Sequence, residues 1–510
     1  MNTRSEYDLL GNMDVPSEAF YGIQTLRTSQ NFSITGVPIS HFPELIKALA
    51  MVKAAAARTN QDMNLLSKEK ADAIVLACQD LILGKYHDQF IVDVIQGGAG
   101  TSTNMNANEV IANIALEKLG HAKGEYKYLH PNDDINRSQS TNDAYPTAAC
   151  LGIQFAADNF VPSLASLKEA LEIKGKEFAH IVKMGRTQLQ DAVPMTLGQE
   201  FEAFAVTLGE DIDRISEACA LLCEVNLGGT AIGTGINTSE GYAKSVVEKL
   251  ATISTKPLVP ASNLVEATSD MGAFVFFSGI LKRLAIKLSK MSNDLRLLSS
   301  GPRTGLGEIN LPPMQPGSSI MPGKVNPVIP EAMNQTAYQV IASDLAVTLA
   351  AEAGQLQLNA MEPMIIYNLL NSLKMLKEAC QMLEKRCISG ITANEAKCAD
   401  HVENSIGIIT ALVPHIGYTN ASRIANTALH TGNTVKALVI EENLLTEEQV
   451  NLLLSPESML SPSKIQLSSA EKPSLDTQAP AKKKAASDKK VTAKKKASSK
   501  KKSPSKKDKL

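Results

Sequence analysis

One segment combines hydroxyl, cationic and amide side chains in a way that suits the binding of an anion. Residues 317–328 read GSSIMPGKVNPV, so Ser318 and Ser319 are followed by Lys324 and Asn326. The glycines and prolines disfavour a helix and predict a loop. Lysine would supply charge, and asparagine and serine hydrogen bonds, to a ligand rich in anionic oxygen. A capped entry to the next helix is the structural alternative, but a cap needs only one Ser or Thr.

Three further polar segments carry short donor side chains. Residues 96–109 (QGGAGTSTNMNANE) include three glycines in four residues, which lets the backbone approach a ligand closely. No GKS or GKT follows, so this segment does not fit a phosphate-binding P-loop. Residues 138–143 (SQSTND) suit a ligand site and a helix cap equally well. Residues 185–194 are predicted to form a polar loop with Thr187 and Gln188 at its head.

Helices must position these segments, because apolar residues recur at helical spacing through most of the chain. Residues 43–58 and 68–83 show this periodicity, and between about 150 and 390 it extends into three heptad seams. The seams are Phe277, Leu281, Leu284, Leu288, Met291, Leu295 and Leu298; Leu369, Leu373, Leu376, Cys380, Leu383 and Cys387; and Leu197, Phe201, Phe204 and Leu208. Helices of roughly 30 residues would span about 45 Å, so we expect a long bundle with helices shared between subunits.

The composition argues against several classes of protein. Aromatic residues make up 4% of the 510 residues and Trp is absent, which is typical of packed helices. No apolar run reaches the length of a membrane span, and the N-terminus has no signal-peptide pattern. The seven cysteines form no CxxC pair and the eight histidines are isolated, so no metal site or disulfide framework is predicted. A cytoplasmic protein is expected.

The net charge of −2 conceals two oppositely charged parts. Residues 482–510 contain 14 Lys and 2 Asp, giving +12, whereas the remaining chain holds 37 Lys and Arg against 51 Asp and Glu, giving −14. This basic stretch lacks large apolar residues, so we expect residues 461–510 to be a disordered linker and Lys-rich tail. The tail is predicted either to bind nucleic acid or another polyanion, or to be a solvated appendage.

The motifs resemble those of a known family. GSSIMPGKVNP is similar to the signature of the fumarase/aspartase superfamily, and DLLGNMDVPSEAFYGIQTLR, GGAGTSTNMNANE, QSTNDAYPT and GRTQLQDAVPMTLGQEF resemble its other blocks, in the same order. The resemblance covers about residues 5–460 and is strongest to the aspartate ammonia-lyase branch. It implies an all-α, three-domain fumarase/aspartase-like fold with a central long-helix bundle. The implied domains are an N-terminal helical domain (1–140), the bundle (141–392) and a small C-terminal helical domain (393–460).

The resemblance also implies a reaction, the reversible elimination of ammonia from L-aspartate to give fumarate. Ser318 would be the general base, and the intermediate would be an aci-carboxylate with two negative charges. The reacting carboxylate would be held by four hydroxyl side chains: Thr101, Ser140, Thr141 and Ser319. The other carboxylate would be held by Thr187, Lys324 and Asn326. The amino group would be contacted by Thr101, Asn142 and Gln188.

The family pattern implies a homotetramer in which each active site is built from three subunits. No cofactor is expected, and Mg²⁺ is expected at most as an activator. Two alternatives remain at this point. Fumarases, and some aspartases, carry His where this chain has Gln188, and Gln cannot act as an acid or base, which argues against a class II fumarase. The basic tail could add nucleic-acid or anionic-surface binding, which deletion of residues 480–510 and a salt-dependent binding assay would separate from catalysis.

Overall fold

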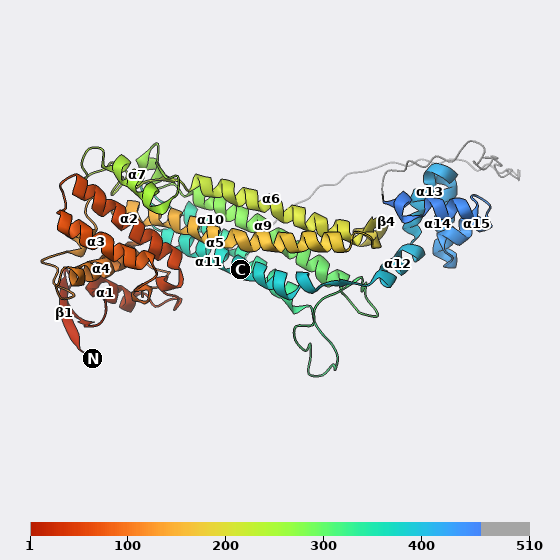
Figure 1. Ribbon diagram of the computed structural model, residues 1–510, viewed down its shortest axis with the longest axis horizontal. Coiled ribbons are helices and arrows are strands. Elements are labelled where there is room, and N and C mark those ends of the chain that lie inside the picture. The colour runs from red at the N-terminus through yellow and green to blue at the C-terminus, as the bar shows by residue number, and fades with distance from the viewer. Residues whose placement is uncertain (1, 461–510) are drawn as a thin grey trace, which may run out of the picture.

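The computed structural model describes residues 2–460, and the predictions for residues 461–510 lie outside these described residues. The chain is elongated, with N-terminal helices at one end, five long helices in the middle and small helices at the other end (Figure 1). Helices dominate all three parts, so the predicted all-α class and central bundle are confirmed. The domain boundaries at 140 and 392 remain predictions.

The N-terminal part is helical, but it opens with a β-hairpin that was not predicted. Strands β1 (Thr3–Asp8) and β2 (Gly11–Pro16) pair in antiparallel register, from Thr3 opposite Pro16 to Asp8 opposite Gly11. Their sequence lacks a regular alternation of apolar and polar residues, which is the usual signal for a strand. The helices that follow are α1 (Ile23–Asn31), α2 (Pro43–Asp62), α3 (Lys68–Ile82) and α4 (Thr101–Lys118).

The central bundle consists of five long helices, α5 (Thr141–Glu177), α6 (Leu197–Leu221), α9 (Gly272–Leu298), α10 (Val328–Glu352) and α11 (Glu362–Arg386). Helix α5 packs against α6 and α11, and α10 packs against α9 and α11. Every residue of the three predicted heptad seams is buried in one continuous apolar core. The long-helix prediction is therefore confirmed, because burial of these seams is what holds the helices side by side.

The polar loop predicted at residues 185–194 is instead part of a second β-hairpin. Strands β3 (Val182–Thr187) and β4 (Gln190–Thr196) pair with Thr187 opposite Gln190, so a two-residue turn joins them. Both turn residues, Gln188 and Leu189, have positive φ, +52° and +63°. Turns of this kind usually contain Asn-Gly or Asp-Gly, so the Gln-Leu pair gave no turn signal in the sequence.

Shorter elements connect the bundle helices. They are η1 (Ile39–His41), η2 (His87–Gln89), η3 (Pro131–Ile135), β5 (Glu224–Val225), α7 (Tyr242–Ser254), β6 (Val259–Pro260), α8 (Leu264–Ala267), β7 (Ile309–Asn310), η4 (Ile388–Gly390) and β8 (Thr392–Ala393). Strand β7 pairs with β8 and ties the start of the long α9–α10 connection to the end of the bundle.

The C-terminal part has its own apolar core, to which Leu412, Ile424 and Val439 contribute fully buried side chains. Its elements are α12 (Glu395–Asn404), η5 (Ile406–Ile408), α13 (Ile409–Ile416), α14 (Tyr418–Thr431), α15 (Val435–Glu441), α16 (Glu447–Leu453) and α17 (Pro456–Met459). Of the helices within residues 2–460, none is long and apolar enough to cross a membrane.

Candidate active site

The starts of α4 and α5 meet at the end of the bundle next to the N-terminal helices (Figure 1). Gly100, with φ of +85°, directly precedes α4 and lies against the ring of Tyr145 in α5. A Cβ at this glycine would lie 2.2 Å from the ring, so only glycine allows the two helix starts to approach this closely. The approach brings four predicted site residues to one end of the bundle: Thr101, Ser140, Thr141 and Asn142.

The hydroxyl groups at the start of α5 are oriented by hydrogen bonds that they accept. Ser140 Oγ accepts from the N–H of Asn142 (3.2 Å), and the Ser140 N–H donates to Asp143 (2.9 Å), which confirms the predicted helix cap. Thr141 Oγ1 accepts from Asn104 Nδ2 (3.1 Å). Because both oxygens accept, both hydroxyl protons are available to a ligand oxygen, and the positive end of the helix dipole favours an anion there.

Two neighbouring side chains have the opposite orientation. Thr101 Oγ1 donates its proton to the carbonyl oxygen of Gly98 (2.7 Å), and Asn142 Nδ2 donates to the carbonyl oxygen of Ala231 (2.8 Å). These bonds leave the Thr101 and Asn142 side-chain oxygens as acceptors, which suits an ammonium group. One end of the bundle therefore offers donors for a carboxylate and acceptors for an amine.

Thr187 and Gln188 lie at the other end of the bundle, on the tip of the β3–β4 hairpin, and both are exposed. The hairpin is held by Arg186, whose Nη1 donates to Glu308 Oε1 at 2.7 Å. Glu308 is fully buried at the start of the α9–α10 connection. The hairpin tip and the base of this connection therefore share one end of the bundle.

The segment predicted to bind an anion is an exposed loop that leaves the bundle between α9 and α10 (Figure 1). It is closed by Gly317, whose N–H donates to the Lys324 carbonyl (2.7 Å) and whose carbonyl accepts from Asn326 Nδ2 (3.2 Å). Ser318 is half-buried, and its Oγ accepts from the Ile320 N–H at 3.2 Å. That bond stabilises negative charge on the Ser318 oxygen, as a serine base requires.

The alternative interpretation of this segment as a helix cap is wrong. Helix α10 begins after Pro327, and no side chain caps its first turn. Ser319 and Lys324 are exposed, so they project from the loop rather than supporting the helix. The loop is therefore a structure of its own, with the predicted base and the predicted cation on it.

A single chain does not bring all ten predicted residues together. The group Thr101, Ser140, Thr141 and Asn142 lies at one end of α5, and Thr187 and Gln188 follow its other end. Because α5 has 37 residues, its ends are about 55 Å apart. A third group lies in the loop between α9 and α10: Ser318, Ser319, Lys324 and Asn326.

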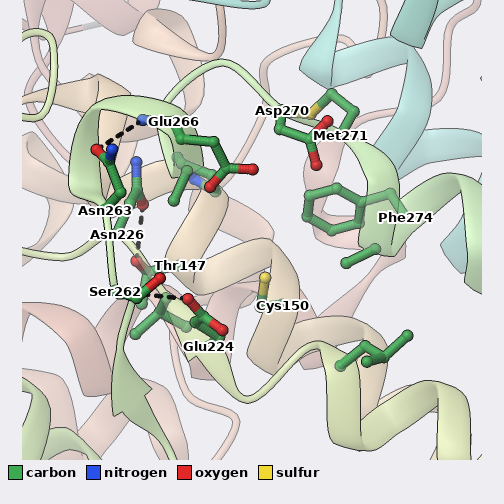
Figure 2. Close-up of a pocket in the computed structure, with 15 residues that line it drawn as sticks. Thr147, Cys150, Glu224, Asn226, Ser262, Asn263, Glu266, Asp270, Met271 and Phe274 are labelled. Carbon is green, nitrogen blue, oxygen red and sulfur yellow. Dashed lines mark hydrogen bonds between the residues drawn. The ribbon is translucent and has the colours of Figure 1, made fainter.

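A separate cavity of about 470 Å³ lies beside α5, at the starts of α8 and α9 (Figure 2). Three carboxylates line it, those of Glu224, Glu266 and Asp270, and no Lys or Arg does. None of the ten predicted residues lines this cavity. Its charge disfavours a dicarboxylate, so this cavity does not suit the substrate that the family resemblance implies.

Sequence reasoning missed a buried polar network behind the start of α5. Lys53, Asn104 and Asn136 are linked by hydrogen bonds of 2.7–3.1 Å. Burial raises the pKa of Asp143 to about 6, although the backbone N–H groups of Ser140, Thr230 and Gly228 and the Lys53 charge lower it. The missed signal was a lysine on the apolar face of residues 43–58, one helical turn after Leu49.

Comparisons with known proteins identify the family of the chain. Residues 11–342 match the family described as "Lyase", and residues 408–461 match "Fumarase C C-terminus". A fumarate lyase:delta crystallin from Brucella melitensis, solved bound to cobalt, is 57% identical with a TM-score of 0.88, over 90% of this chain and 100% of that one. A class II fumarase from Schistosoma mansoni is 35% identical with a TM-score of 0.86, over 90% of this chain and 99% of that one.

The chain therefore belongs to the lyase family that forms the fumarase/aspartase superfamily. Among its relatives, the aspartate ammonia-lyase of Pseudomonas aeruginosa is 64% identical, over 91% of this chain and 98% of that protein. The aspartate ammonia-lyase of Escherichia coli is 53% identical, over 90% of this chain and 97% of that protein. The predicted membership is confirmed, and so is the resemblance to the aspartate ammonia-lyase branch.

Proposed function

We propose that this protein is an aspartate ammonia-lyase, which converts L-aspartate reversibly into fumarate and ammonia. The observation that carries the proposal is the pairing of donors with acceptors where α4 and α5 begin. Ser140 and Thr141 keep protons for a carboxylate, while Thr101 and Asn142 keep lone pairs for an ammonium group. The names of the relatives that share more than half of the sequence support the same activity.

In the proposed mechanism, the Ser318 oxyanion removes a proton from the carbon beside one carboxylate. The electron pair moves onto that carboxylate, which becomes a dianionic aci-carboxylate held by Ser140, Thr141 and Ser319. Reformation of the carboxylate then breaks the C–N bond, and ammonia leaves. Oriented donors matter most for this intermediate, because they stabilise charge that is absent from the substrate.

The other substrate carboxylate would be held by Thr187, Lys324 and Asn326, and Gln188 would help to contact the amine. Lysine supplies a point charge that suits a carboxylate. A glutamine at position 188 offers an acceptor oxygen for ammonium but no titratable group. The alternative activity, hydration of fumarate to malate, would use the same fold without needing an amine acceptor.

We infer that the active enzyme is a homotetramer whose sites each draw residues from three subunits. This is supported by the distance between the predicted site residues within one chain. It is also supported by apolar side chains on the outer faces of α6, α9 and α10, which are 52–60% exposed in the single chain: Val206, Ile286, Tyr338, Leu345 and Leu349. Exposed apolar rows of this kind suit burial against further copies of the chain.

We further propose that turnover needs no cofactor and that Mg²⁺ acts at most as an activator. The compartment is proposed to be the cytosol, in accordance with seven cysteines that are all free thiols. The basic tail, residues 482–510, is proposed to add binding to nucleic acid or another polyanion without taking part in catalysis.

The test is the absorbance of fumarate formed from L-aspartate, with parallel samples containing L-malate, each with and without a metal chelator. Fumarate from aspartate in the presence of chelator is the expected result. Fumarate from malate alone would instead identify a fumarase, and dependence on metal would overturn the cofactor proposal.

Replacement of the proposed base gives a second test. Ser318→Ala is expected to reduce kcat by about 10³-fold or more, because it removes the hydroxyl that would carry the oxyanion. Binding of succinate, an unreactive dicarboxylate, should persist and can be measured by calorimetry. Near-normal turnover by this variant would exclude Ser318 as the base.

A further inference from the structure

A buried lysine lies behind the Thr141 hydroxyl. Lys53 in α2 is fully buried, and its Nζ donates to Asn104 Oδ1 (2.7 Å) and Asn136 Oδ1 (2.9 Å). Asn104 Nδ2 in turn donates to Asn136 Oδ1 and to Thr141 Oγ1, each at 3.1 Å. A single amide side chain therefore connects this lysine to a hydroxyl of the proposed substrate site.

The orientation of Asn104 is fully determined by these partners. Its Oδ1 accepts from Lys53 Nζ, which turns the amide nitrogen toward Asn136 and Thr141. With both amide protons committed, the Thr141 oxygen always accepts, and its own proton must point elsewhere. The network thus excludes Asn104 as an acceptor and leaves the Thr141 proton for a ligand.

The positive charge of Lys53 is not neutralised by its hydrogen-bond partners, because both are amide oxygens. Burial lowers the pKa of Lys53 to about 7, although the nearby Asp143 in α5 and Cys78 in α3 raise it. Negative charge that develops beside Thr141 favours the protonated lysine. In a buried network of low dielectric, that charge also polarises the amide between them.

We propose that Lys53 is a positioning residue that, through Asn104, holds the Thr141 proton toward the dianionic carboxylate of the intermediate. The inference rests on the proposed function, in which Thr141 binds the reacting carboxylate. The effect of a buried positive charge grows as that carboxylate gains its second negative charge. Lys53 and Asn104 should therefore matter more for the intermediate than for the substrate.

Two ligands distinguish binding of the substrate from binding of the intermediate. Succinate carries ordinary carboxylates, whereas 3-nitropropionate ionised to its nitronate has a planar group with two anionic oxygens, like the aci-carboxylate. In Asn104→Asp an oxygen still faces Lys53, but the donor to Thr141 is lost and the lysine charge is neutralised. We expect nitronate binding to weaken about 10- to 100-fold. Succinate affinity should change by less than about threefold.

A matched control lies on the same helix. Asn106 is as deeply buried as Asn104, but its Nδ2 donates to the carbonyl oxygen of Gln89, away from Thr141. Asn106→Asp therefore introduces the same buried carboxylate without breaking the hydrogen bonds that link Lys53, Asn104 and Thr141. It should leave the ratio of nitronate to succinate affinity unchanged, whatever it does to the melting temperature.

A double-mutant cycle tests whether the effect passes through Thr141. In a Thr141→Val background, adding Asn104→Asp should weaken nitronate binding by no more than about twofold, because the hydroxyl that Asn104 orients is already absent. Lys53→Met should show the same nitronate-selective loss, and it replaces Asn104→Asp in the cycle if that variant does not fold. Equal losses for both ligands, or a full additional loss in the double variant, would overturn the proposed positioning role of Lys53 and Asn104. If the unmodified protein does not bind nitronate more tightly than succinate, the proposed function itself fails.

Discussion

Hydrogen bonds made inside the chain decide whether each polar side chain at the start of α5 presents a proton or a lone pair. Ser140 and Thr141 accept internally and so can donate outward, whereas Thr101 donates to Gly98 and so can only accept. The family resemblance implied that Thr101 contacts both the reacting carboxylate and the amine. Its orientation in this structure favours the amine.

A second buried group, Glu362 at the start of α11, lies outside the proposed site. Neither carboxylate oxygen has a hydrogen-bond partner among residues 2–460, and burial raises its pKa well above the usual value. The folded state therefore keeps a proton that the unfolded chain releases above about pH 4.5, so folding stability falls as pH rises. The loss is about 1.4 kcal/mol per pH unit until the folded pKa is reached.

Glu362→Gln removes this dependence, because glutamine does not ionise. The melting temperature of the variant relative to the unmodified protein should therefore increase between about pH 5 and pH 8. Scanning calorimetry at both pH values, at one protein concentration, measures the difference. Glu378→Gln, on an exposed part of the same helix, is the control and should show equal differences at both pH values. A difference for Glu362→Gln that is also constant with pH would contradict the claim that the folded state keeps Glu362 protonated.

At the scale of the elements, a buried ion cluster joins three parts of the chain at the far end of the bundle. Glu308, at the start of the α9–α10 connection, contacts Lys183 Nζ (2.9 Å) and Arg186 Nη1 (2.7 Å) in β3. It also contacts His401 Nδ1 (2.9 Å) in α12. Burial alone would raise the Glu308 pKa, but Lys183, His401 and Arg186 together lower it.

Because the folded pKa is lowered, the cluster stabilises the fold above about pH 4.5 and ceases to do so as pH falls through the folded value. Glu308→Gln should lower the free energy of unfolding by about 3–5 kcal/mol at neutral pH, since it removes the buried carboxylate that the cations of the cluster share. Within residues 2–460, Lys183 retains only Glu200, at 2.6 Å, as a carboxylate partner. The loss relative to the unmodified protein should shrink in acid. Urea titrations at pH 7 and pH 4 measure both effects.

The control for this prediction is Glu395→Gln in α12, whose carboxylate is 67% exposed and lies 3.6 Å from His180. A surface pair of this kind contributes little, so we expect a change of less than about 1 kcal/mol at either pH. If Glu308→Gln behaved like this control, the cluster would not be what holds the hairpin to α12.

The elements differ in how well the sequence predicted them. The heptad seams predicted the long helices, because apolar residues at heptad spacing form one helix face that is buried when helices pack together. The hairpin that carries Gln188 was missed, because its turn lacks the residues that favour positive φ. Glu109 lies in a segment considered for ligand binding, yet its carboxylate accepts from the N–H groups of Gly22, Gln24 and Thr25 at the start of α1. A contact between segments this far apart leaves no local pattern.

The candidate site was predictable as a set of residues but not as a geometry. Four polar segments could be recognised from residue types, whereas the role of each hydroxyl depends on partners such as Asn104 and Gly98 that only the folded chain defines. Lys53 was overlooked because the other residues from Leu49 to Ala57 are all apolar. Its hydrogen-bond partners come from residues about 50 and 80 positions away.

At the scale of the whole molecule, the proposed sharing of sites between subunits predicts complementation. Thr141→Val and Ser318→Ala homotetramers should each be nearly inactive. When equal amounts are unfolded together and reassembled, about a quarter of the sites should receive both intact residues, because each comes from a different subunit. Fumarate formation by the mixture measures this recovery.

Each variant carried through the same procedure alone is the control and should stay inactive. A mixture no more active than these controls would mean that both residues of a site belong to one chain. In that case the loop with Ser318 would have to fold back along the bundle, contrary to its position beside the far end (Figure 1).

The length of α5 has a consequence for how this chain can change. One inserted or deleted residue inside the helix rotates everything beyond it by about 100° and shifts it by about 1.5 Å. In the proposed tetramer, the hairpin with Thr187 would then no longer match the position at which a neighbouring copy presents Thr141. If sites are shared as proposed, the length of α5 sets the spacing between them, so length variation in this protein is expected in its connections and termini and not along this helix.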